Sequence, residues 1–131
     1  MRGNKVIDWE HRLKAVFDEI DAELENEYGS RYPLHPSRPK RGTTSNPETD
    51  GLFNVGAAFS AGFGSKNGPG YTVEIRLSTL RHVPENIRTE IKEKVFQSLE
   101  NKLPSAFPDR DLNVTEEDGV IRIHGDLSLT K

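Results

Sequence analysis

Apolar residues near the start of the chain recur with the period of an α-helix. The pattern predicts a helix over about residues 9–28, because its apolar positions fall every three to four residues and share one face. Asp8 is a suitable N-cap, and Gly29 stands where a glycine commonly follows the end of a helix. The apolar positions are Trp9, Leu13, Val16, Phe17, Ile20, Leu24 and Tyr28.

Two segments in the middle of the chain alternate between apolar and polar residues, as strands with one buried face do. In residues 53–63 the odd positions are apolar, and residues 71–79 follow the same alternation as far as Leu77. The dipeptide Asn67-Gly68 lies between them. It favours a hairpin, because both residue types tolerate the positive φ that tight turns require.

A second helical repeat predicts a helix over about residues 84–103, with Pro84 suited to its first position and Pro104 expected to end it. Two short strands follow, over about residues 111–116 and 119–129, joined at Asp118-Gly119. In the last strand, one face holds Ile121, Ile123, Leu127 and Leu129, and the other holds Arg122, His124, Asp126 and Ser128.

The predicted order of elements is therefore αββαββ, within a single α+β domain over residues 1–131. Each helix has one apolar stripe and each strand one apolar face. Both helices should thus cover one face of a four-stranded antiparallel or mixed sheet, in a two-layer sandwich. The order resembles a ferredoxin-like domain whose first strand has been moved to the C-terminus by circular permutation. With two hairpins and a right-handed crossover, we expect the sheet order 3-4-2-1, with the second and fourth strands central and parallel.

Composition narrows the class of protein. The chain has 131 residues, a net charge of −3 and 30% charged residues, which indicates a hydrophilic globular domain. It has no cysteine, so disulfides, thiolate zinc sites and cysteine nucleophiles are excluded. No apolar run is long enough to span a membrane, no apolar signal core follows the N-terminus, and the four histidines lack a metal-ligand spacing. We expect a cytoplasmic protein without a cofactor, a metal site or membrane contact.

The acidic balance hides a basic, proline-rich segment. Residues 30–47 contain Arg31, Arg38, Lys40 and Arg41 and no acid, so they carry +4. Subtracting these four from the 18 basic residues leaves 14 against 21 acids, so the rest of the chain carries −7. Prolines recur every third residue from 33 to 39, which favours a polyproline II stretch within a long loop over about residues 30–50.

Three roles are open for this loop. Its cations, together with the hydroxyl and backbone N–H groups of residues 42–46, could hold an anion such as phosphate. Its two overlapping P-x-x-P-x-R matches fit a segment presented to a partner protein. The loop could instead lie on the first helix and neutralise the six acids of its second half, which stand near the negative end of the helix dipole.

The uncovered face of the predicted sheet is the second candidate site. It could bind a ligand, pack on a second copy through the small outward residues of the first strand, or remain solvated with weak ion pairs. The outward positions of the second and fourth strands hold no aromatic residue on which bases could stack, so nucleic-acid binding is disfavoured. The charged residues of this face are Glu74, Arg76, Arg122, His124 and Asp126.

These features favour a small non-enzymatic binding domain that uses the loop 31–45, the open sheet face or both. Its partner would be a protein, a second copy of the chain in a homodimer, or a small anionic ligand. The alternative is a small enzyme for an anionic substrate, in which His124 is the acid/base, Asp126 or Glu74 orients it, and the loop is a lid. The predicted anion-binding residues are Arg31, Arg38, Lys40, Arg41, Arg76 and Arg122.

Overall fold

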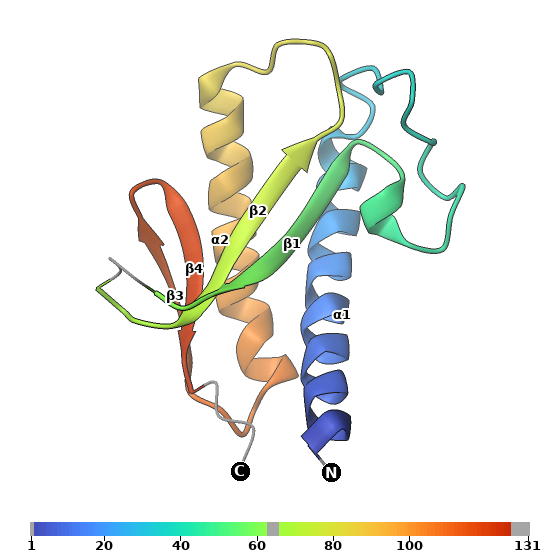
Figure 1. Ribbon diagram of the computed structural model, residues 1–131. Coiled ribbons are helices and arrows are strands. Elements are labelled where there is room, and N and C mark those ends of the chain that lie inside the picture. The colour runs from blue at the N-terminus through green and yellow to red at the C-terminus, as the bar shows by residue number, and fades with distance from the viewer. Residues whose placement is uncertain (1, 63–65, 127–131) are drawn as a thin grey trace.

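Two helices and four strands follow one another as αββαββ in the computed structural model, which describes residues 2–62 and 66–126 (Figure 1). The helices are α1 (Arg2–Tyr28) and α2 (Glu85–Ala106), and one turn of 3-10 helix, η1 (Pro47–Thr49), interrupts the loop after α1. The strands are β1 (Phe53–Ser60), β2 (Gly70–Leu77), β3 (Leu112–Glu117) and β4 (Val120–Gly125). The predicted α+β class is confirmed.

The sheet has the order β1-β2-β4-β3, which is the predicted order, and all three strand pairs are antiparallel. The prediction that the two central strands are parallel is wrong. A crossover through α2 returns β3 in the direction of β2, and the tight turn to β4 then reverses the chain. Strand β4 must therefore run against β2, as the pairing of Gly70 with His124 and of Thr72 with Arg122 shows.

The core lies between the helices and the sheet. The apolar stripes of α1 and α2 join the inward residues of the strands in one cluster of buried side chains. In Figure 1 both helices lie on the same side of the sheet. Helix α2 contributes Ile91, Val95, Leu99 and Leu103, which are its buried residues.

Helix α2 continues past the predicted stop at Pro104 and ends at Ala106. Proline cannot donate a backbone hydrogen bond, so one bond of the last helical turn is missing. The ring of Pro104 is exposed, and the turn closes through the bond from the Phe107 N–H to the Leu103 carbonyl at 2.8 Å. The missing bond is the one to the Glu100 carbonyl, and the helix ends two residues after the proline, at Ala106.

Strand β1 is buried only at its beginning. Phe53 and Val55 are buried as predicted, but Phe59 is 63% exposed although it shares their face. A cavity of about 370 Å³ between α1 and the end of β1 is lined by Leu13, Phe17 and Phe59, so the helix does not close over this ring. The alternation predicted correctly which residues share this face. The prediction that the whole face packs on the helices was wrong, because Phe59 is exposed.

Strand β4 is buried on both faces. Arg122 is 5% exposed and His124 is 9% exposed, so the face expected to be open is covered here. The β1–β2 hairpin crosses the β3–β4 hairpin (Figure 1). The two are joined by a hydrogen bond from Asn67 Nδ2 to Glu117 Oε2 at 2.9 Å. Gly70 permits this close approach, because a Cβ at that position would lie 2.4 Å from the Ile123 carbonyl oxygen. The predicted end of this strand, residues 127–129, lies outside the described residues.

Candidate functional site

The basic loop docks on the acidic half of α1. Arg41 Nη1 lies 2.6 Å from Asp21 Oδ1 and 3.7 Å from Asp50 Oδ1. Further along α1, the Glu25 carboxylate accepts the Leu52 N–H at 2.8 Å, so the end of the loop is also fixed to the helix. Of the three roles considered for the loop, this geometry matches the neutralisation of its own helix.

The two aspartates that face Arg41 have opposite pKa shifts. Burial raises the pKa of the Asp21 carboxyl to about 6, although Arg41 acts against this shift. The pKa of Asp50 is lowered, first of all by the hydrogen bond from the Thr44 N–H. Asp21 and Asp50 are each 1% exposed, so a single cation faces two buried carboxylates.

The predicted phosphate grip at residues 42–46 holds an anion of the protein itself. Asp50 Oδ2 accepts the Gly42 N–H at 3.1 Å, the Thr44 N–H at 2.9 Å and the Thr44 hydroxyl at 3.1 Å. The chemistry expected of this segment is therefore present, but its donors are used by the carboxylate of Asp50. Sequence reasoning missed this because Asp50 lies just beyond the basic segment.

Arg38 is held in a different way, by carbonyl oxygens alone. Its Nε donates to the Gly51 carbonyl at 2.9 Å, and its Nη2 lies 2.9, 3.0 and 3.2 Å from the carbonyl oxygens of Glu48, Asp50 and Phe53. Among the residues that the structure describes, no carboxylate lies within ion-pairing distance of this guanidinium, and no acceptor is bonded to its Nη1. Within residues 2–62 and 66–126, Arg38 is thus a fixed positive charge without a carboxylate partner.

Arg38 lines a cavity of about 510 Å³, which we call the Arg38 cavity. The cavity lies between the loop and the segment that follows β2, and these are tied together by the bond from the His35 N–H to the Ser78 carbonyl at 2.8 Å. Its wall consists of His35, Ser37, Arg38, Pro39, Glu48, Thr49, Leu77, Ser78 and Thr79. No sequence pattern marks this site, because its two walls are about forty residues apart in the chain.

The tautomer of His35 follows from its contacts. The Ser37 backbone N–H can only donate, and it lies 3.1 Å from His35 Nδ1, which must therefore accept. The Ser37 hydroxyl, 2.7 Å from the same nitrogen, then also donates to it. In the neutral ring the proton accordingly lies on Nε2, which makes His35 a hydrogen-bond donor through that atom.

The other predicted anion-binding residues lie in different surroundings. The Arg31 guanidinium stacks over the Tyr28 ring at 4.6 Å, and the exposed Arg76 pairs with Glu74 at 3.2 Å. The buried Arg122 pairs with Glu117 at 3.4 Å. Lys40 is exposed, and within the described part of the chain no hydrogen bond or ion pair holds its ammonium group.

The structure separates two residues of the alternative catalytic site, His124 and Glu74. His124 is opposite Gly70 in the β2–β4 pairing, four residues from Glu74, or about 13 Å along the strand. Its Nε2 lies 3.2 Å from the Thr115 hydroxyl, and Asp126 has passed the end of β4. The expectation that Glu74 and Arg76 lie beside Arg122, His124 and Asp126 followed from parallel central strands, and the antiparallel pairing of Gly70 with His124 contradicts it for His124.

The loop is also not a lid over His124. It meets β2 at the C-terminal end, where Leu77 lines the Arg38 cavity, whereas His124 pairs with Gly70 at the opposite end. Seven residues of strand separate these points, which is about 23 Å. The proposed union of loop and histidine in one active site is contradicted by this distance.

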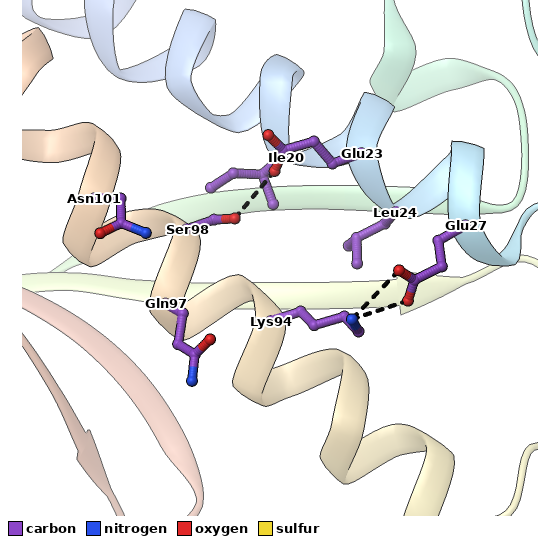
Figure 2. A pocket seen from close by; sticks show the side chains of 8 residues that line it. All are labelled: Ile20, Glu23, Leu24, Glu27, Lys94, Gln97, Ser98 and Asn101. Carbon is purple, nitrogen blue, oxygen red and sulfur yellow. Dashed lines mark hydrogen bonds and ion pairs between the residues drawn. The ribbon is translucent and has the colours of Figure 1, made fainter.

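A further cavity, of about 240 Å³, lies between the helices (Figure 2). Ile20 and Leu24 are its apolar wall, and polar pairs bridge it from α1 to α2. Lys94 Nζ lies 3.1 Å from Glu27 Oε2, and the Ser98 hydroxyl donates to Glu23 at 3.0 Å. The Glu27–Lys94 and Glu23–Ser98 pairs therefore join α1 to α2 across this cavity.

The chain belongs to a protein family described as "Uncharacterised protein", whose model matches residues 4–125. A similar protein of Borreliella burgdorferi strain B31, described as "Uncharacterized protein", is 34% identical over 125 residues. That alignment covers 95% of this chain and 98% of the relative. No solved structure matches the chain. Within the described residues, no helix combines the length and apolar character needed to cross a membrane.

Proposed function

We propose that the protein is a small non-enzymatic binding module that takes an anionic ligand in the Arg38 cavity. The observation that carries this proposal is the guanidinium of Arg38, fixed by four carbonyl hydrogen bonds and without a carboxylate partner in the described structure. A charge held in place in this way attracts an anion without losing side-chain entropy on binding. The Arg38 cavity is wide and open to solvent, and its volume of about 510 Å³ leaves room for a small anion.

Other arginines of the chain differ from Arg38 in having carboxylate partners, which supports Arg38 as the anion-binding residue. Arg41, Arg76 and Arg122 each have a carboxylate within 4 Å, so an external anion would compete with an internal one. Arg38 requires no such exchange. The cytoplasm remains the expected location of such a module.

Calorimetric titration of the protein with citrate and with inorganic phosphate at low ionic strength tests the proposal. Arg38→Gln removes the guanidinium and its charge, so we expect affinity to fall by about one to two orders of magnitude, the equivalent of one charged hydrogen bond. Arg76→Gln removes an equal charge from the exposed sheet face and is the matched control. Equal loss in both variants would show that the anions respond only to net charge, and the proposal would fail.

A homodimer is a second candidate, favoured by one exposed ring at an edge strand. Strand β1 contains no charged residue and no proline, which are the usual protections of a sheet edge, and Phe59 stands exposed near its end. Light scattering should then give a dimer mass for the wild type and a monomer mass for Phe59→Lys. Leu80→Lys, at an exposed apolar residue outside the sheet, should leave the mass unchanged. A monomeric wild type excludes this candidate.

A further inference from the structure

The hydrogen-bond donors that line the Arg38 cavity indicate what kind of anion it would bind. This inference rests on the proposed function. Arg38 cannot offer the two-pronged fork with which arginine grips a planar carboxylate. Its Nε and Nη2 hydrogens are directed at carbonyl oxygens, so only Nη1 remains for a ligand. A ligand bonded to Nη1 alone must find its remaining donors elsewhere on the cavity wall.

Those donors come from both walls. His35 lines the cavity, and the donor of its neutral ring is the Nε2–H, because Nδ1 is the accepting nitrogen. On the opposite wall, the Thr79 hydroxyl oxygen accepts the Arg81 N–H at 3.2 Å, which leaves the hydroxyl proton of Thr79 available to donate. Ser78 adds a second hydroxyl on that wall. Single donors that approach from different sides match an anion whose oxygens point in different directions.

Glu48, the acidic residue among those that line the cavity, does not prevent an anion from binding near Arg38. Glu48 lines the cavity, but its Oε1 lies 3.8 Å from the place of a Cβ on Gly56. Gly56 stands three residues along β1 from Phe53, the residue whose carbonyl holds Arg38. The carboxylate of Glu48 is therefore directed along the strand, away from the Arg38 end of the cavity.

We infer that the anchoring group of the ligand is a phosphoryl group, carried by a small phosphorylated molecule. A tetrahedral phosphate monoester offers three terminal oxygens to Arg38 Nη1, His35 Nε2 and the Thr79 hydroxyl, whereas a carboxylate has two oxygens in one plane. The monoester also carries nearly two charges at neutral pH, against one for a carboxylate or a sulfate ester. The rest of the cavity would take the organic part of the molecule.

Titrations with four probes at pH 8 test this inference: inorganic phosphate, acetate, phenyl phosphate and phenyl sulfate. We expect phosphate to bind at least tenfold more tightly than acetate, and phenyl phosphate at least tenfold more tightly than phenyl sulfate. Thr79→Val, which keeps the shape and removes the hydroxyl, should weaken phosphate binding about tenfold. Thr43→Val, at an exposed loop threonine, is the matched control and should bind as the wild type does. Thermal unfolding of both variants verifies that they fold.

The outcomes separate this inference from the proposed function. If acetate or phenyl sulfate binds as tightly as its phosphate counterpart, or if Thr79→Val binds phosphate unchanged, the phosphoryl inference is overturned and anion binding by Arg38 stands. If Thr79→Val does not fold, the comparison of the four probes on the wild type decides alone. If none of the four anions binds the wild type, both the inference and the proposed function fail.

Discussion

Asp21 gives the most quantitative test of how the loop is docked. Its carboxyl is 1% exposed, and its contact with Arg41 does not offset the cost of burying the charge. The pKa rises from an ordinary value of 3.8 to about 6, a difference of roughly 2.2. At 1.36 kcal/mol for each pKa unit, the ionised carboxylate destabilises the folded state by about 3 kcal/mol.

The sign of the pH dependence follows directly. Because the folded pKa is raised, folding favours the protonated carboxyl, so this contribution to stability is greatest below pH 3.8 and is lost as the pH rises towards 6. Asp21→Asn keeps a carbonyl oxygen for Arg41 but cannot ionise. The stability of the wild type minus that of Asp21→Asn should therefore fall by about 3 kcal/mol between pH 3 and pH 7, and then remain constant.

Urea unfolding at a series of pH values measures this difference. Trp9 is the single tryptophan, it is buried, and its ring lies 4.4 Å from that of Phe107, so its fluorescence reports the folded core. Asp50→Asn is the matched control with the opposite sign, since the pKa of Asp50 is lowered and its stabilisation is lost only at acid pH. A wild-type minus Asp21→Asn difference that is flat, or that rises with pH, would refute the assignment of a destabilising buried charge to Asp21.

Three further substitutions test the packing. Leu99→Ala removes a fully buried side chain of α2 and should lower the free energy of unfolding by about 2–5 kcal/mol in urea titrations. Gly70→Ala places a Cβ 2.4 Å from the Ile123 carbonyl, so we expect a loss of about 1–3 kcal/mol and weaker amide protection where β2 meets β4. Tyr71→Phe removes the acceptor of the Trp9 Nε1–H at 2.9 Å and should cost about 0.5–1.5 kcal/mol, with a changed indole NMR signal. If the free energy of unfolding is unchanged in any of the three variants, the stabilising role assigned to that contact is wrong.

The helices, strands and their order could be predicted because each has a local periodic signal. The apolar stripe of α1 and the alternation of β2 depend on residues within one element. The direction of β4 against β2 was also within reach of sequence reasoning, since a crossover followed by a tight turn determines it. The incorrect prediction of parallel central strands therefore came from the reasoning about chain connections and not from an ambiguous residue pattern.

The site could not be predicted in the same way, because its contacts join distant parts of the chain. The burial of Arg122 depends on packing of the β1–β2 hairpin, and the partner of the loop's donors is Asp50, which no pattern marks. The Arg38 cavity requires the loop and the residues after β2 to meet. The sequence indicated that Arg38 lies in a basic segment. Its partners are backbone carbonyl groups, which every residue has, so no sequence pattern could identify them.

An NMR titration of the isotope-labelled protein with inorganic phosphate tests the central claim most directly. If the Arg38 cavity is the anion site, the side-chain NH signals of Arg38 and the amide signals of Ser37, Ser78 and Thr79 will shift together with one saturating affinity. The signals of Arg41, which has an internal carboxylate, will stay in place. Shifts centred on Arg41 or on the sheet face around Arg76, with Arg38 unmoved, would contradict the account.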